Sequence, residues 1–184
     1  RPLSQVRWFL TADLSRQVAP VLDSARTCIG RVGLAKTTLD DVAREAGCAR
    51  ATVYRCFANK QRLLTALVLR EAGELHDLVV TEAAHTDELG DAITAVVVTS
   101  VDSLRTNPAL AFICAHEPEL LLPFLAFEQE DAVLRNAAAL VAPAFARYLD
   151  EDAAVRRGEW ITRITLSYLF NPSENFDIGD DVSV

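Results

Sequence analysis

Basic, hydroxyl and aromatic side chains lie together in residues 50–57, where Val53 and Phe57 are one helical turn apart. If both apolar residues pack inward, the remaining side chains face outward from a short helix. Arg, Thr and Tyr side chains on such a face can hydrogen bond to the base edges and phosphates of a nucleic acid. The outward-facing residues are Arg50, Thr52, Tyr54, Arg55 and Cys56.

A second helix and a glycine turn must position this face. Thr38 is suited to N-cap a short helix, with Asp41 in a weak form of the capping box, and Gly47 ends that helix. A helix, a tight turn and a second helix allow the second helix to lie in the major groove of DNA. The same spacing fits a helical hairpin with solvated arginines, so spacing alone leaves both interpretations open.

Apolar residues recur at intervals of three and four through most of the chain, which predicts an all-α fold. A helix over 17–32, stopped by Gly33, precedes the motif, and Asn59 can cap a long helix from Lys60 towards His85. Lys60, at the start of that helix, is placed for the DNA backbone. Further helices are predicted over 88–106, 108–115, 117–127, 129–149 and 153–170.

Charge is distributed unevenly along the chain. Residues 1–62 hold eleven basic and five acidic side chains, whereas residues 63–184 hold seven basic and twenty-one acidic ones. The net charge of −8 is therefore the sum of +6 in residues 1–62 and −14 in residues 63–184. Only residues 1–62 carry the positive charge that binding to phosphates requires.

The segment from Val18 to Leu67 resembles the DNA-binding region of the tetracycline-repressor (TetR) family. The likeness is densest over T-x-x-x-V-A-x-x-A-G-x-x-x-x-T-V-Y-x-x-F-x-N-K-x-x-L-L, beginning at Thr38. The resemblance implies a homodimeric repressor that binds a pseudo-palindromic double-stranded DNA operator and is released by a small-molecule effector. It also implies that Thr38 caps its helix beside a phosphate and that Tyr54 and Lys60 contact phosphates. The residues that it places towards the groove are Arg50, Ala51, Thr52 and Arg55.

Together these features divide the chain into four parts. They are an N-terminal extension (1–17), a helix-turn-helix domain (18–62), a ligand-binding and dimerisation domain (63–170) and an acidic tail (171–184). Two positions depart from the family pattern. Ala49 lacks the Ser or Thr side chain that caps the recognition helix, a contribution of about 1 kcal/mol. Cys56 replaces a residue that is often His or Tyr in the family.

The N-terminal extension has two interpretations. It is either an arm that reaches DNA or a disordered or dimer-packing segment.

The predicted ligand-binding and dimerisation domain is interpreted from its apolar residues. A cluster of them in the middle of this domain could line a pocket for a lipophilic ligand, although such residues also form ordinary cores. The predicted pocket residues are Phe112, Leu121, Phe124, Leu125 and Phe127. In the family the last two helices pack against their copy, so we expect the dimer interface on 129–149 and 153–170, with aromatic anchors amid small residues. The predicted interface residues are Ala138, Ala142, Trp160, Ile164 and Tyr168.

An enzyme is the competing class. The chain has no G-x-S-x-G, Gly-rich phosphate loop or H-E-x-x-H, and its four cysteines form no C-x-x-C pair. We therefore expect no catalysis, no metal and no cofactor. No run approaches the ~20 apolar residues that cross a bilayer, and the first residues do not show the pattern of a signal peptide. We therefore expect no membrane contact and a cytoplasmic location. The better rival is a ligand-binding helical protein whose helix-turn-helix no longer binds specific DNA.

Overall fold

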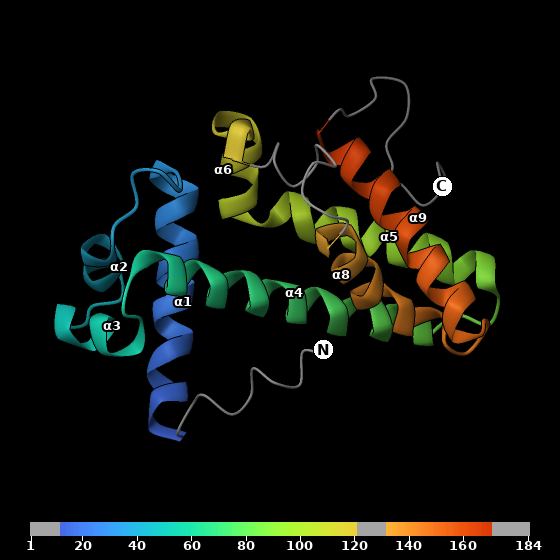
Figure 1. The fold of residues 1–184 in the computed structure, drawn as a ribbon, viewed down its shortest axis with the longest axis horizontal. Coiled ribbons are helices and arrows are strands. Elements are labelled where there is room, and N and C mark those ends of the chain that lie inside the picture. The colour runs from blue at the N-terminus through green and yellow to red at the C-terminus, as the bar shows by residue number, and fades with distance from the viewer. Residues whose placement is uncertain (1–11, 121–131, 171–184) are drawn as a thin grey trace.

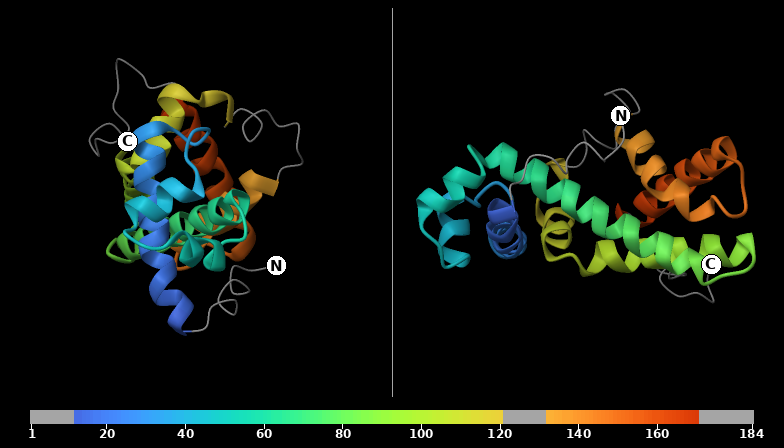
Figure 2. Two further views of the ribbon diagram at one scale, coloured as in Figure 1. Left: turned by 90° about the vertical axis from the view of Figure 1, so that its left-hand side faces the viewer. Right: turned by 90° about the horizontal axis from the view of Figure 1, so that it is seen from below.

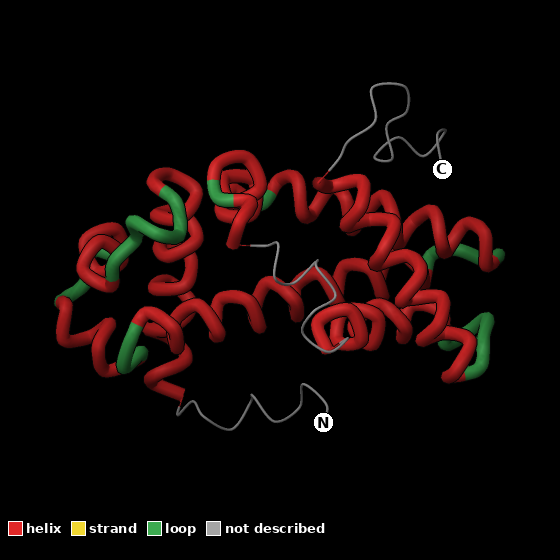
Figure 3. The backbone as a smooth tube through the Cα atoms, turned by 45° about the horizontal axis from the view of Figure 1, so that its top comes forward, coloured by secondary structure: helices red, strands yellow, loops and turns green. Residues whose placement is uncertain are grey.

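The computed structural model describes residues 12–120 and 132–170, and within these ranges all regular structure is helical (Figure 3). The predicted all-α fold is therefore confirmed. The first four helices are α1 (Ala12–Val32), α2 (Leu39–Glu45), α3 (Arg50–Cys56) and α4 (Lys60–Ala84). They are followed by α5 (Leu89–Thr106), α6 (Pro108–His116), the 3-10 turn η2 (Pro118–Leu120), α8 (Ala132–Val141), the 3-10 turn η3 (Ala142–Phe145) and α9 (Glu151–Phe170).

The long helix α4 joins two groups of helices (Figures 1 and 2). Helices α1, α2 and α3 surround the start of α4, and we call residues 12–67 the head. Helices α5 and α8 pack along the rest of α4, and α9 packs on α8 and α5. We call residues 68–120 and 132–170 the body. Helix α6 returns from the body to lie against α1, so the two groups also touch beside α4 (Figure 1).

The head has its own apolar core, built around α1. Val42 of α2, Val53 of α3 and Leu63 of α4 are almost completely buried against it. Gly33 and Gly47 turn the chain after α1 and α2 with φ of 88° and 62°, backbone conformations that glycine adopts without steric cost. The sequence predicted both turns correctly, because the glycines and the apolar spacing are local signals.

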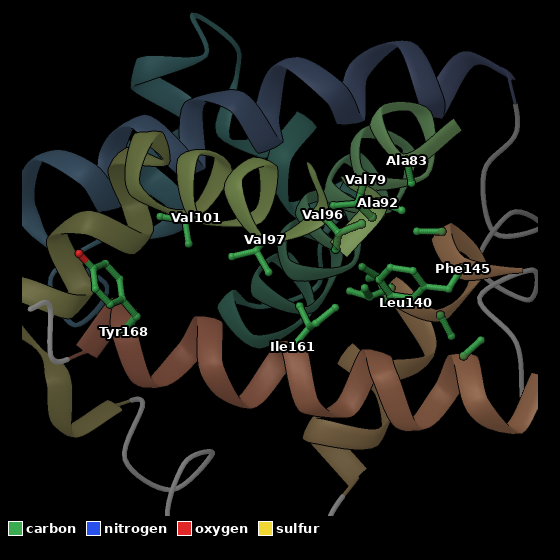
Figure 4. Close-up of a cluster of buried hydrophobic side chains, with 14 residues drawn as sticks. Val79, Ala83, Ala92, Val96, Val97, Val101, Leu140, Phe145, Ile161 and Tyr168 are labelled. Atoms are coloured by element: carbon green, nitrogen blue, oxygen red, sulfur yellow. The ribbon is translucent and has the colours of Figure 1, made fainter. Parts of the chain in front are cut away.

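A second core fills the body. Val79 of α4, Val96 of α5, Phe145 of η3 and Ile161 of α9 point towards one another and are almost fully buried (Figure 4). Gly158 lets α9 approach α8 closely, since a Cβ there would lie 2.6 Å from the carbonyl oxygen of Ala138. This close contact lets α8 and α9 share the core of the body.

The structure corrects several predicted helices. Of the predicted helix 117–127 it describes only the 3-10 turn η2, and residues 121–127 lie outside the described residues. Helix α1 starts at Ala12 and not at residue 17, because its first turns carry no apolar periodicity that the sequence pattern could detect. The predicted helix 129–149 is not continuous: α8 ends at Val141, and Pro143, which lacks an N–H, lies in the 3-10 turn that follows. Helix α9 begins at Glu151 and not at 153, with an Asp150 carboxylate oxygen accepting a hydrogen bond from Ala153 N.

Candidate nucleic-acid interface

Helices α2 and α3, with the Gly47 turn between them, form the predicted helix-turn-helix. Thr38 N-caps α2 as expected: its Oγ1 accepts from Asp41 N (3.2 Å), while Asp41 Oδ2 accepts from Thr38 N (3.1 Å). The Thr38 hydroxyl also donates to Asp41 Oδ2 (2.6 Å) and lowers the pKa of that carboxyl. Because both donors of Thr38 are given to Asp41, its predicted phosphate contact requires one of these bonds to open.

Helix α3 buries one side and exposes the other. Val53 and Phe57 are buried in the head core, as predicted. Arg50, Ala51, Tyr54 and Arg55 are exposed, and half of the Tyr54 surface is accessible. The N-cap position Ala49 makes no side-chain capping bond, which confirms the predicted absence of a cap.

Two residues of α3 lie deeper than predicted. Thr52 is half-buried. Cys56 was expected to face outward but is half-buried against the head core, and burial raises the pKa of its thiol. The physical reason is that Cys56 adjoins the buried Phe57 at the end of a short helix, where the chain turns towards α4.

The two arginines of α3 are held by partners in the head. Arg50 pairs with Asp40 Oδ2 at 3.0 Å, and Arg55 donates to Gln17 Oε1 at 3.0 Å. The Arg50 side chain remains 70% exposed, and an exposed pair contributes only about 0–1 kcal/mol. A bidentate contact with a guanine is worth about 1–3 kcal/mol. The pair with Asp40 is therefore weaker than a base contact would be, and it leaves most of the Arg50 side chain exposed.

Lys60 lies at the start of α4, and its ammonium binds the loop between α1 and α2. Lys60 Nζ donates to the carbonyls of Leu34 (2.6 Å) and Ala35 (3.2 Å). On the other side of the loop, the Glu117 carboxylate accepts from Leu34 N (2.7 Å) and Ala35 N (3.2 Å). Two carbonyl partners leave the third donor of the ammonium available for a phosphate.

The predicted pocket residues are placed only in part. Phe112, half-buried on α6, stacks on His116 with ring centroids 4.4 Å apart. Leu121, Phe124, Leu125 and Phe127 lie outside the described residues.

A cleft of about 390 Å³ between α1, α4 and the α5–α6 junction has a different character. Its polar lining includes Arg26, Glu71 and Asn107, with Asn107 Nδ2 donating to Glu71 Oε2 at 2.6 Å. It is not the apolar pocket that the sequence predicted.

The predicted interface residues fall into two groups. Ala138, Ala142 and Tyr168 are buried within the subunit's own core, where small side chains let α8 and η3 pack closely on the rest of the body. Trp160 of α9 is 51% exposed, with the Arg157 guanidinium 5.9 Å from its ring centre, and Ile164 is half-buried. Of these residues, Trp160 presents the largest accessible apolar surface.

The described helices and side chains bear on two other kinds of function. None of the described helices is long and apolar enough to cross a membrane. Among residues 12–120 and 132–170, no cluster of three or more His, Cys, Asp or Glu side chains is arranged to hold a metal ion.

Sequence reasoning missed the contacts that hold the helix-turn-helix and the loop before it. Asp40, Gln17 and Glu117 each bind a residue or loop of the head, and the sequence predicted none of these contacts. Glu117 is separated from its partners Leu34 and Ala35 by 83 and 82 positions. No local pattern signals such a contact, because it depends on α6 returning to α1.

Comparison with known proteins is consistent with this geometry. Residues 21–67 match the sequence model of the bacterial regulatory proteins of the tetR family. An HTH-type transcriptional regulator of Mycobacterium tuberculosis H37Rv is 29% identical over 160 residues, which cover 84% of this chain and 75% of that protein.

Solved structures share the fold. The TetR family repressor AlkX from Dietzia, implicated in n-alkane biodegradation, has a TM-score of 0.65 at 22% identity, covering 88% of this chain and 86% of that one. The regulator FadR from Bacillus subtilis, in complex with stearoyl-CoA, has a TM-score of 0.54 at 14% identity, covering 88% and 91%.

Proposed function

Because this chain belongs to the tetR family of bacterial regulatory proteins, we propose that it represses transcription as a homodimer bound to a pseudo-palindromic operator, in the cytoplasm. That it is a DNA-binding transcriptional regulator follows from the family. The observation that carries the proposal is the exposed face of α3, where Arg50, Tyr54 and Arg55 stand clear of the head core. The excess of positive charge in residues 1–62 supports binding to phosphates through the same end of the molecule.

The experiment that tests this function is selection of genomic fragments from the bacterium that encodes the chain, using the purified protein. We expect the recovered fragments to share a pseudo-palindrome whose half-sites lie about one helical turn, or a multiple of it, apart. Recovery of no common sequence would favour the rival, a ligand-binding helical protein that does not bind specific DNA.

The individual roles on α3 and α4 are separable by substitution. We propose that Arg50 reads a base, so Arg50→Ala costs about 1–3 kcal/mol on the selected site and relaxes the preference at one base step. Tyr54 and Lys60 hold phosphates, so Tyr54→Phe and Lys60→Ala weaken binding to every duplex by similar factors. Arg44→Ala is the matched control, since it removes the same charge from α2. If Arg50→Ala weakens selected and mixed-sequence duplexes equally, Arg50 is a backbone contact.

We propose further that the effector is small and lipophilic. The support is the apolar composition around residues 110–127 and the relatives, one bound to stearoyl-CoA and another implicated in n-alkane degradation. Dodecane, dodecanoic acid and stearoyl-CoA, added separately to the protein–operator complex, are suitable probes. Release of the operator by one of them supports the proposal, and unchanged binding with all three would contradict it.

A further inference from the structure

The loop between α1 and α2, residues 33–37, is held by charged side chains from two other helices. Glu117, the residue that ends α6, accepts hydrogen bonds from the N–H groups of Leu34 and Ala35. Lys60, the first residue of α4, donates to the carbonyls of the same two residues. A carboxylate therefore binds the N–H groups, and an ammonium group the carbonyls, of the same two consecutive residues.

This arrangement accounts for most of the polar backbone groups of the loop. Besides the four groups bound by Glu117 and Lys60, the Gly33 carbonyl accepts from the hydroxyl of Thr37 at 2.7 Å and from its N–H at 3.2 Å. Gly33 also gives the carboxylate room, because a Cβ there would lie 2.6 Å from Glu117 Oε1 and 2.8 Å from Phe112 Cε1. The loop conformation thus depends on a residue of the body.

The loop in turn determines where Lys60 lies. The Lys60 side chain is half-buried with its ammonium fixed on two carbonyls, so its rotamers are already restricted before DNA arrives. A free lysine side chain has to lose its rotamer entropy when it binds a phosphate, which weakens the contact. The same loop leads directly into Thr38, the cap of α2.

From this geometry we infer that Glu117 is a positioning residue for DNA binding: it fixes the α1–α2 loop, and the loop presents the Lys60 ammonium to a phosphate. This inference rests on the proposed phosphate contact of Lys60. Glu117 itself bears a negative charge and does not touch DNA. Its loss is expected to weaken DNA binding even though removing a negative charge by itself favours binding to phosphates.

A double-mutant cycle tests the inference. The probe is a labelled duplex of mixed sequence, about three helical turns long, and its affinity is measured by fluorescence anisotropy over a series of salt concentrations. The variants are Glu117→Ala, Lys60→Ala and the pair together. Glu119→Gln is the matched control, because Glu119 is exposed on η2 and its loss changes the charge without touching the loop.

We expect Glu117→Ala to weaken binding about tenfold with Lys60 present, the equivalent of about 1.4 kcal/mol, and to have little effect in the Lys60→Ala background. Lys60→Ala lowers the slope of log affinity against log salt by about 0.9 per contact. Glu117→Ala leaves that slope unchanged, because the charges that meet DNA remain. Glu117→Gln, which keeps one acceptor, gives an intermediate affinity, and Glu119→Gln does not weaken binding.

Two outcomes overturn the inference. One is an equal loss of affinity from Glu117→Ala in both backgrounds, which would mean that Glu117 acts through general stability and not through Lys60. The other is no loss at all in a variant whose amides at residues 34 and 35 exchange hydrogen faster than in the parent. If the Glu117→Ala variant does not fold, the same cycle is run with Glu117→Gln. Failure of the parent to bind any duplex would refute the proposed function, and this inference with it.

Discussion

The close contact between α8 and α9 yields a prediction whose sign can be worked out from the structure. Gly158 is buried on α9, and a Cβ added there would lie 2.6 Å from the carbonyl oxygen and 3.3 Å from the carbonyl carbon of Ala138. Both atoms belong to the backbone of α8, so no side-chain rotation can relieve the clash. Substitution Gly158→Ala therefore requires the two helices to move apart.

The expected change in stability is the difference between two effects. Alanine is better than glycine inside a helix by about 0.8–1 kcal/mol. Overpacking of a well-packed core costs about 1–3 kcal/mol. We expect the second effect to prevail and Gly158→Ala to lower the free energy of unfolding by about 1 kcal/mol, which shifts Tm by roughly 2–4 °C in a chain of this size.

Gly73 in α4 provides the matched control. A Cβ at that position meets nothing within 4 Å, so Gly73→Ala keeps the helix gain without a clash. We expect it to raise the free energy of unfolding by about 0.8–1 kcal/mol. Urea denaturation followed by circular dichroism measures both variants at one protein concentration, because formation of the proposed dimer would add to apparent stability. If Gly158→Ala stabilises the protein as much as Gly73→Ala does, the tight contact between α8 and α9 is refuted.

Three further predictions concern other parts of the molecule. Hydrogen bonds from Thr38 lower the folded-state pKa of the Asp41 carboxyl. The stability that the ionised carboxylate contributes is therefore fully present above the unfolded pKa of 3.8 and is lost as the pH falls through the folded pKa. In denaturation curves taken at decreasing pH, the difference in free energy of unfolding between the parent and Asp41→Ala should shrink. Burial raises the pKa of the thiols of Cys28, Cys56 and Cys114, so at pH 8 iodoacetamide should modify them more slowly in the folded than in the unfolded chain, as mass spectrometry would show. Trp160 is half-exposed on α9, so Trp160→Arg should leave the subunit folded but weaken a dimer by burying an unpaired charge; an unchanged dimer in light scattering would place the interface elsewhere.

The sequence by itself determined the helix-turn-helix. Thr38, Gly47 and the one-turn spacing of Val53 and Phe57 are signals that act within a few residues, through a cap, a left-handed turn and an apolar stripe. Such features act locally and do not depend on how the rest of the chain folds. The exposed face of α3 and the long helix that starts at Lys60 were therefore predictable from the sequence.

The roles of small residues in the body required the tertiary structure. Ala138 and Ala142 indicated close packing in the sequence, but the partner they were expected to meet was a second subunit. The structure shows α8 packed on α9 of the same chain, with Ala138 opposite Gly158. A small side chain indicates that another helix approaches closely. Which helix that is depends on the path of the chain in space.

The hydrogen bonds that Lys60 and Glu117 make to the α1–α2 loop also depend on the tertiary structure. Lys60 was predicted from its position at a helix start, yet its binding to the carbonyls of Leu34 and Ala35 has no sequence signature. Glu117 reaches the same loop from more than eighty residues away, because Gly30 and Gly33 allow α6 to lie against α1. Local chemistry specified which residues form α2 and α3, whereas long-range packing decided which side chains hold the α1–α2 loop, since hydrogen bonds between distant segments form only where the whole fold brings donor and acceptor together.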